Sequence, residues 1–194
     1  MRNNLYTFIR SLLAGICIAI GCNVYLSCDN KYFGSILFSV GLISILYMGF
    51  NLFTGKIGYI QQVGLINIIV ILIGNIVGCF IIGTLYYSEK AEILFEQKLQ
   101  LCTSDIIINS VMCGLIMYMA VSMYNSNNNI IPVIMCVSVF ILSGYEHSIA
   151  DITYCIMGRT FTLQSIYFLT IVVIGNTIGG MIIPLCNTII NKTK

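Results

Sequence analysis

The stretch Ser143-Gly-Tyr-Glu-His-Ser-Ile-Ala-Asp151 decides the fold, because it places three ionisable side chains directly after a long apolar run. That run begins at Ile130 or Pro132 and contains no charged residue before Gly144. A charged side chain at the centre of a bilayer costs at least about 2.5 kcal/mol on insertion scales, so such residues face a cavity or the interior of a helix bundle. The stretch therefore predicts a membrane helix that is interrupted beside a cavity.

The composition of the whole chain points to the same environment. The 194 residues are 58% hydrophobic and 8% charged, and the mean hydropathy is +0.96. Soluble domains carry about 25% charged residues. Nine basic and seven acidic side chains cannot cover the surface of a 21.5 kDa globule in water. The composition excludes soluble enzymes, nucleic-acid-binding proteins and disordered proteins.

The cysteines indicate neither a metal site nor a disulfide scaffold. They lack Cys-x-x-Cys and Cys/His spacings, so we expect no metal and no cofactor. Cys28 and Cys102 fall near loops, and we expect them to remain unpaired. The other seven lie in apolar stretches and are predicted to be small buried hydrophobic residues; they are Cys17, Cys22, Cys79, Cys113, Cys136, Cys155 and Cys186.

Apolar runs of about 20 residues, the length that crosses a bilayer core, predict six transmembrane helices. The six form a single transmembrane domain over residues 1–194, and the second and fifth are interrupted. They run from about Leu5 to Leu26, Phe33 to Phe53, Val63 to Tyr86, Ile106 to Met123, Ile130 or Pro132 to beyond Gly144, and Leu163 to about Cys186.

Six crossings place both termini on one side of the membrane, and the distribution of Lys and Arg predicts which side. Arg2, Arg10, Lys56, Lys192 and Lys194 fall on the terminal side, against Lys31, Lys90, Lys98 and Arg159 on the other. This excess predicts cytoplasmic termini. The longest polar connection, Ser88 to Asp105, is then external and is expected to contain a short amphipathic helix.

Two pairs of related segments predict an internal repeat. Ile73-Gly-Asn-Ile-Val-Gly78 resembles Ile174-Gly-Asn-Thr-Ile-Gly179, and each follows a span that turns polar after a Gly-aromatic pair, at Gly49 and at Gly144. Three spans per half, about 5–86 and 106–187, give the two halves opposite orientations, as in the inverted repeats of many transporters and channels. Alternatively, Asn75 and Asn176 serve only to bond and pack neighbouring helices.

Three motifs resemble signatures of the formate/nitrite transporter family, which also contains hydrosulfide channels. They are Phe50-Asn-Leu-Phe-Thr-Gly-Lys56, Ser143-Gly-Tyr-Glu-His-Ser-Ile-Ala-Asp151 and Ile174-Gly-Asn-Thr-Ile-Gly-Gly180, of which the second is the most specific. The resemblance covers nearly the whole chain. It implies an aquaporin-like protomer with its own pore, assembled as a homopentamer with cytoplasmic termini.

The resemblance also implies roles for particular residues. His147 matches the central pore histidine, Glu146 the glutamate before it, Thr54 the threonine of the break in the second span, and Lys98 the lysine before the fourth span. The apolar constrictions of the formate-type pore fall on Phe38, Leu42, Phe53 and Phe140.

The chain departs from the family pattern at three places. Asp151 replaces the usual asparagine, and Gly114 occupies the position of a pore-facing asparagine in the fourth span. The segment before the first span is very short, which puts in doubt any gating role for it. Asp151 lies one helical turn after His147, so it is placed to hydrogen-bond the imidazole, to point toward lipid headgroups or to meet a neighbouring subunit.

These features predict a passive, proton-linked channel for small monovalent anions or their weak acids, most of all formate. Apolar constrictions exclude a bare anion, whereas a neutral acid passes; Lys98 would gather the anion in a vestibule. Either His147 donates a proton, or it keeps a fixed charge and offers a hydrogen bond while the proton comes from water.

Other functions follow less directly. The alternative substrates for a channel of the same fold are hydrosulfide and nitrite. The alternative from a different functional class is a membrane scaffold that transports nothing. No motif of an intramembrane enzyme is present, so we expect a multi-pass protein of the inner or plasma membrane that is not an enzyme and binds no nucleic acid.

Overall fold

The computed structural model describes residues 2–192, and every regular element in that range is a helix. The side chains of Arg2 and Lys192 and all of Lys194, which entered the charge count, lie outside the described part. The elements are α1 (Arg2–Ser27), α2 (Lys31–Met48), α3 (Phe53–Lys56), a 3-10 turn (Ile57–Tyr59), α4 (Ile60–Val63), α5 (Leu65–Leu85), α6 (Glu89–Leu99), α7 (Thr103–Asn127), α8 (Ile131–Leu142), α9 (Ser148–Met157) and α10 (Leu163–Lys192).

Five helices of the described part are long and apolar enough to cross a membrane: α1, α2, α5, α7 and α10. They coincide with five of the six predicted spans. The remaining predicted span is divided into two shorter apolar helices, α8 with 12 residues and α9 with 10. The polar connection contains the expected short helix, α6.

Both interruptions occur at a glycine with a left-handed backbone. Gly49 has φ +66° and caps the C-terminus of α2, so this helix ends before Phe53, the end that the sequence suggested. Gly144 has φ +70° and follows the end of α8. Side chains disfavour this conformation, and glycine adopts it readily. The backbone then runs extended until Phe53 starts α3 and Ser148 starts α9.

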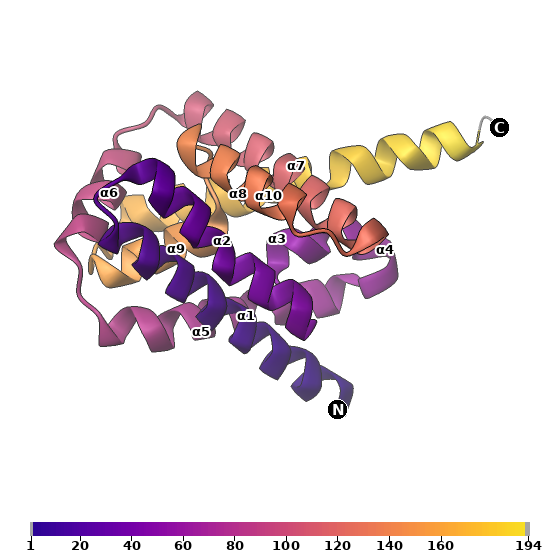
Figure 1. Cartoon of the computed structure of the whole chain (residues 1–194), viewed down its shortest axis with the longest axis horizontal. Coiled ribbons are helices and arrows are strands. Elements are labelled where there is room, and N and C mark those ends of the chain that lie inside the picture. Colours follow the sequence, from indigo (N-terminus) through magenta and orange to yellow (C-terminus); the bar gives the residue numbers. More distant parts are fainter. Residues whose placement is uncertain (1, 193–194) are drawn as a thin grey trace.

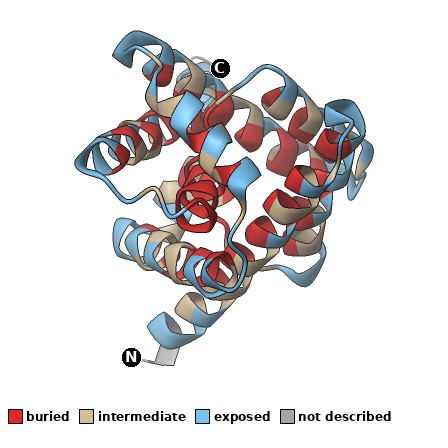
Figure 2. Ribbon diagram, turned by 90° about the vertical axis from the view of Figure 1, so that its left-hand side faces the viewer, coloured by how far each residue is buried: buried red, intermediate tan, exposed pale blue. Residues whose placement is uncertain are grey.

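The core of the molecule is the short helix α9, whose ten residues are all buried. The ribbon at the centre of Figure 2 is accordingly buried on every side, whereas the surrounding helices are buried mainly on their inner faces. Helix α9 contacts α5, α6, α1 and α10, and α1 packs along α5 as α7 packs along α10. The break before α9 is thereby held in the middle of the bundle.

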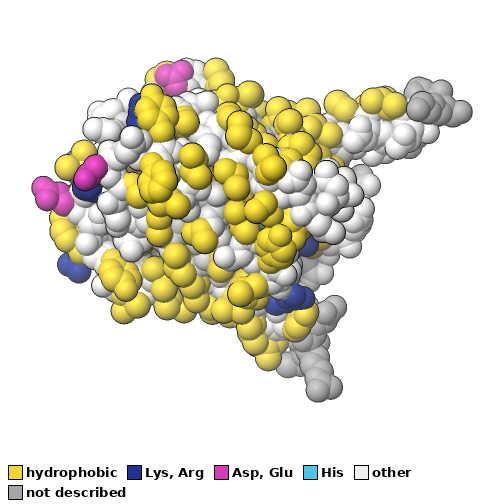
Figure 3. Space-filling view, viewed as in Figure 1, with side chains coloured by type: hydrophobic (Ala, Val, Ile, Leu, Met, Phe, Trp, Pro, Cys, Tyr) yellow, Lys and Arg dark blue, Asp and Glu magenta, His cyan; other side chains and the backbone are white. Residues whose placement is uncertain are grey.

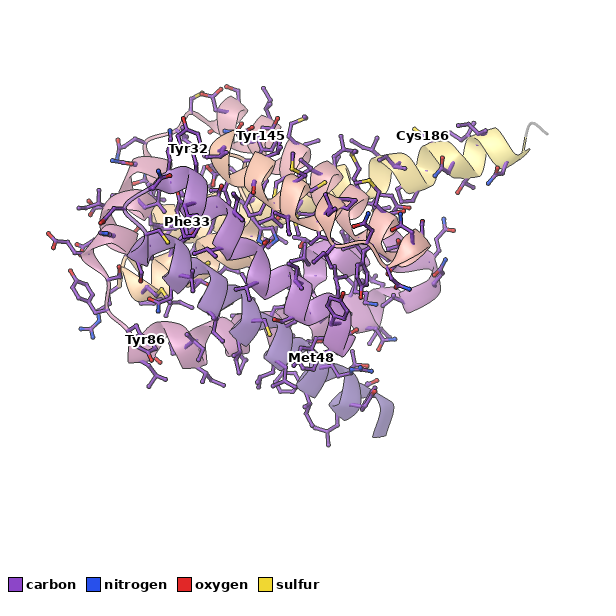
Figure 4. The ribbon with its side chains drawn as sticks, in the orientation of Figure 1. Tyr32, Phe33, Met48, Tyr86, Tyr145 and Cys186 are labelled. Carbon is purple, nitrogen blue, oxygen red and sulfur yellow. The ribbon has the colours of Figure 1, made fainter. Side chains whose placement is uncertain are left out.

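The surface has an apolar middle and polar ends. Hydrophobic side chains cover much of the face in Figure 3, and the acidic side chains visible there gather at the end where α6 lies. In Figure 4, Tyr32 and Phe33 mark the first turn of α2 and Met48 marks its last residue; all three are exposed. Both termini lie at the end opposite α6 (Figure 1). This distribution suits helices that face lipid.

All nine cysteines are free thiols, as expected for Cys28 and Cys102. Five of the seven predicted to be buried are buried, but Cys17 is half-buried and Cys186 is exposed. Cys186 follows Pro184 and lies in the part of α10 that projects from the bundle, as labelled in Figure 4. Its position in an apolar run gave no sign of that projection.

Candidate functional site

Thr54 and His147, one from each helix break, meet in the interior of the bundle. Thr54 Oγ1 lies 2.9 Å from His147 Nε2, and both residues are at most 1% exposed. Thr54 is the second residue of α3, and His147 is the residue that caps α9. The two short helices therefore start close together and bring two residues 93 positions apart into hydrogen-bond contact.

Asn75 on α5 holds the first break. Its side-chain oxygen accepts a hydrogen bond from the Phe53 amide at 2.8 Å, and its nitrogen donates to the carbonyls of Ser11 (2.7 Å) and Asn51 (2.9 Å). The Asn75 side chain thus gives partners to the Phe53 amide and the Asn51 carbonyl, two backbone groups at the helix break that lack a partner within a helix.

Asn176 on α10 holds the second break with the same set of bonds. Its oxygen accepts from the Ser148 amide at 2.9 Å, and its nitrogen donates to the carbonyls of Ser110 and Glu146, both at 2.8 Å. The two Asn-x-x-Gly segments thus do more than pack helices, because each fixes the backbone that presents a site residue.

The hydrogen bonds of His147 determine which ring nitrogen carries the hydrogen. The amide of Ala150 donates to Nδ1 at 3.2 Å, which requires a lone pair on Nδ1. The hydrogen of the neutral ring is then on Nε2, from which it points to the Thr54 hydroxyl oxygen. Protonating Nδ1 would break the Ala150 bond and place a cation at the N-terminus of α9, where the helix dipole opposes it.

An aromatic pair lies against the imidazole. The Phe140 ring stacks on His147 with a centroid separation of 5.5 Å, and Phe38 meets Phe140 edge to face at 5.6 Å. Leu42 and Phe53, the other two predicted constriction residues, are also buried, with exposures of 1% and 2%. The structure thus joins Phe38, Phe140 and His147 in one contact chain.

Two cavities approach this group from opposite ends. The smaller, of about 90 Å³, is bordered by Lys98, Phe140, His147 and Asp151 on the side of α6. The larger, of about 280 Å³, is bordered by Leu42, Leu52 and Lys56 near α4, at the other end of the bundle (Figure 1).

The sequence reasoning missed several polar residues that border these cavities, among them Tyr154, Lys56 and Tyr25. Tyr154 borders the smaller one and lies two helical turns after His147, so helical spacing from the histidine was a signal for it. Lys56 borders the larger one and follows Thr54 by two residues. Tyr25, on α1, had no such signal, because only the fold brings it to the cavity.

Lys98, which was expected to gather anions in a vestibule, lies in the last turn of α6 and reaches into the protein. Its ammonium contacts the Glu146 carboxylate and lies 3.1 Å from Asp151 Oδ1. The side-chain exposures are 14% for Lys98, 2% for Glu146 and 1% for Asp151. Burial lowers the pKa of Lys98, but the Asp151 and Glu146 carboxylates outweigh it and raise this pKa above its ordinary value, so the ammonium stays charged.

The suggestions that Asp151 bonds the imidazole, faces lipid headgroups or meets a neighbouring subunit are therefore wrong. Helical spacing brings only its amide to His147, as the donor to the His147 carbonyl at 2.8 Å. Its carboxylate turns to Lys98 instead, because α6 packs against α9 and supplies a cation there.

Replacing Lys98 by methionine should lower the free energy of unfolding by about 3–5 kcal/mol, because it leaves two buried carboxylates without their cation. Thermal unfolding of the purified protein in detergent would measure the loss. Lys90→Met is the matched control, since Lys90 pairs with Asp29 at 3.5 Å with both side chains exposed. Equal, small effects of the two substitutions would contradict the importance assigned to the buried cluster.

The structure gives Gly114, whose role the sequence left open, a place in helix packing. A β-carbon at Gly114 would point at the backbone of α10 and lie 2.3 Å from the Asn176 carbonyl oxygen. Gly15 has the same relation to Asn75, with 2.1 Å to the carbonyl oxygen. These two glycines let α7 approach α10, and α1 approach α5, closely enough for the asparagine bonds.

Gly114→Ala should therefore destabilise the fold by about 1–3 kcal/mol or more, as overpacking against backbone does. The melting temperature in detergent measures this. Gly34→Ala on α2 is the control, because its β-carbon would come no closer than 3.1 Å to any atom, and a shift of a few tenths of an ångström relieves such a contact. A melting temperature of Gly114→Ala at or above that of the control would show that the helices have room to separate.

A family model described as "Formate/nitrite transporter" matches residues 1–189. Among curated relatives, the formate channel FocB of Escherichia coli (strain K12) is 26% identical over 240 aligned residues, covering 94% of this chain and 85% of that protein. The formate channel FocA of Haemophilus influenzae is 25% identical over 189 residues, covering 78% of this chain and 66% of that protein.

Solved structures show the same fold. A pentameric formate channel with formate bound superposes with a TM-score of 0.81 at 23% identity, over 100% of this chain and 99% of that chain. An ion channel of the same family gives 0.77 at 20% identity, over 93% and 86%. These relatives are channels and not enzymes. The match over residues 1–189 shows that this chain belongs to the formate/nitrite transporter family.

Proposed function

We propose that the protein is a passive, proton-linked channel for small monovalent anions and their weak acids, with formate as its preferred substrate. The observation that carries the proposal is the contact between Thr54 and His147 next to the Phe38–Phe140 pair, between two cavities. The Nε2–H of His147 and the hydroxyl of Thr54 can donate hydrogen bonds to a small polar molecule at this apolar constriction. The names of the curated relatives support formate.

The architecture of the proposal is an aquaporin-like inverted repeat of three helices plus three. The halves are residues 5–86 and 106–187 of a single transmembrane domain, with α2 and α3 forming the interrupted second crossing and α8 and α9 the fifth. The matching bonds of Asn75 and Asn176 support the repeat, and the placement of both termini opposite α6 supports an even number of crossings. The termini are cytoplasmic, and the protein lies in the cell membrane.

The proposed assembly is a homopentamer in which every protomer has its own pore. The solved structure with a TM-score of 0.81 is described as a pentameric formate channel, which supports this assembly. The fold also supports one pore per protomer, because both helix breaks and both cavities are formed by a single chain.

The proposed mechanism rests on the cost of moving charge through the constriction. The Born cost of transferring a carboxylate-sized ion into a medium of low dielectric constant is on the order of 20 kcal/mol before relaxation. A neutral acid avoids most of that cost. Formate therefore takes up a proton in the smaller cavity, crosses between Phe38 and Phe140 as formic acid, and releases the proton at the larger cavity, which Leu42 borders. Phe53 is buried at the start of α3 and is the remaining apolar constriction residue of the proposal.

In this mechanism His147 remains neutral, so we favour the second of the two roles considered for it. The Nε2–H of His147 and the Thr54 hydroxyl donate hydrogen bonds to the anion and orient it while the proton arrives from elsewhere. Lys98 is not a free cation that gathers anions, since Glu146 and Asp151 occupy it. Lys98 and Asp151 instead form a polar wall of the smaller cavity, and Glu146 holds the Lys98 ammonium in place from behind.

Uptake into proteoliposomes tests the proposal. Formate, nitrite, hydrosulfide and chloride are each added outside over a range of external pH. We expect formate uptake to exceed the others and to rise as external pH falls, with chloride excluded. Faster uptake of hydrosulfide or nitrite would assign the channel to that substrate, and the absence of flux for all four would leave a membrane scaffold.

A further inference from the structure

Three charged groups are buried together beside the pore, and their charges do not cancel. One ammonium, that of Lys98, contacts two carboxylates, those of Glu146 and Asp151. With both acids ionised the cluster carries a net charge of −1 in a site where the carboxylates are at most 2% exposed. Two carboxylates this close, sharing one cation, cannot both stay ionised without a large cost.

Asp151 provides a specific place for a proton. Its Oδ1 contacts Lys98, whereas its Oδ2 is buried and has no hydrogen-bond partner among the described residues. A charged carboxylate oxygen that is buried without a hydrogen-bond partner loses its hydration and gains nothing in return. Protonation removes the charge and most of that cost. Asp151 also borders the 90 Å³ cavity together with His147 and Phe140, so this carboxyl group adjoins the space where an anion would wait.

Among the residues that the structure describes, no other cation balances the cluster. The groups that face Asp151 are Lys98 and Glu146, the thiols of α1, α7 and α9, and a phenol of α9, and the thiols and phenol are neutral at physiological pH; they are Cys22, Cys113, Cys155 and Tyr154. His147 precedes Asp151 by one turn, but its bond from the Ala150 amide keeps it neutral.

We infer that Glu146 and Asp151 share one proton at neutral pH and that Asp151 delivers this proton to the anion in the adjoining cavity. The inference rests on the proposed function and adds the residue that protonates the substrate. The O–H bond of the carboxyl group breaks and an O–H bond forms on formate. The cluster is left at −1, with Lys98 holding both carboxylates, and water at the α6 end returns the proton.

The pH profile of formate uptake tests the delivery step with Asp151→Asn, which is nearly isosteric and cannot donate an acidic proton. Wild-type uptake should rise only shallowly as external pH falls through neutrality, by much less than tenfold per pH unit, because the cluster protonates the anion. Uptake by Asp151→Asn should continue but fall about tenfold per pH unit, in proportion to the formic acid already present in solution. Identical profiles for the two proteins, or no uptake by the variant at acidic pH, would overturn the delivery role.

Infrared difference spectroscopy tests the shared proton without any transport. Wild-type protein at neutral pH should show a protonated carboxyl band that shifts in heavy water. Asp151→Asn and Glu146→Gln should each abolish it, since a single remaining carboxylate pairs with Lys98 and stays ionised. The five other acids are at least partly exposed to solvent, so a buried carboxyl band is assigned to the cluster. Persistence of the band in either variant, or no band in wild type, would refute the shared proton; wild-type liposomes without flux would refute only the proposed function.

Discussion

Replacing His147 by alanine should lower the permeability ratio of formate to chloride by about 10- to 100-fold. The Nε2–H group and the Thr54 hydroxyl are the two donors at the constriction, and a hydrogen bond to a charged group contributes about 1.5–3 kcal/mol. If His147 donates its hydrogen bond to formate before formate is protonated, removing that bond slows formate permeation about tenfold for every 1.4 kcal/mol that the bond contributed. Radiolabelled formate uptake and chloride efflux from the same liposomes measure the ratio.

Two variants show whether the effect comes from the lost donor. His147→Asn keeps an N–H donor and a side chain that caps helices well, so it should give an intermediate ratio. Thr54→Val keeps the volume of the side chain but removes the hydroxyl, and it should resemble His147→Ala. If His147→Ala retains the wild-type ratio while the oligomer remains intact, the imidazole is a structural cap of α9 and takes no part in permeation.

Replacing Phe140 by alanine should admit chloride, with an increase of at least about 100-fold over the wild-type leak. The ring lies between Phe38 and His147, so its removal joins the small cavity to the constriction and lets water follow the ion. The cost of transferring an ion into a medium of low dielectric constant is on the order of 20 kcal/mol. Lowering the barrier to chloride by about 2.7 kcal/mol is enough for a 100-fold increase in its flux. Chloride efflux from liposomes and single-channel recording both detect it.

Phe140→Leu is the matched control for this experiment. Truncation of a buried phenylalanine to alanine costs about 3–5 kcal/mol of stability, so the alanine variant requires a check of its oligomeric size and melting temperature. Leucine keeps an apolar obstruction and should continue to exclude chloride. A folded Phe140→Ala variant that still excludes chloride would show that the aromatic pair is not the barrier.

Much of the fold follows from local chemistry in the sequence. Apolar length alone predicted the long helices, and the glycines at 49 and 144 marked both breaks, because only glycine adopts their left-handed backbone readily. The repeated Asn-x-x-Gly segments pointed to related halves. The exact end of α2 was missed, because an apolar residue such as Phe53 fits a helix and an extended segment equally well by composition.

The site was harder to predict, because its contacts join segments far apart in the chain. Thr54 and His147 could be paired through the family resemblance, although no periodicity connects positions 93 residues apart. Lys98 looks solvated in its own polar segment, and only the packing of α6 on α9 shows that it is nearly buried against two acids. The role of Gly114 could not be predicted, because glycine has no side chain whose direction the sequence could indicate, and only the approach of α10 shows what it faces.

The most direct measurement is the response of formate uptake to membrane potential. Liposomes holding the wild-type protein are clamped at different potentials with a potassium gradient and valinomycin, and formate entry and internal pH are followed together. Passage as a neutral acid predicts entry that is independent of potential and acidifies the lumen by one proton per formate. Entry that increases with an inside-positive potential, without matching acidification, would mean that the anion itself crosses the constriction.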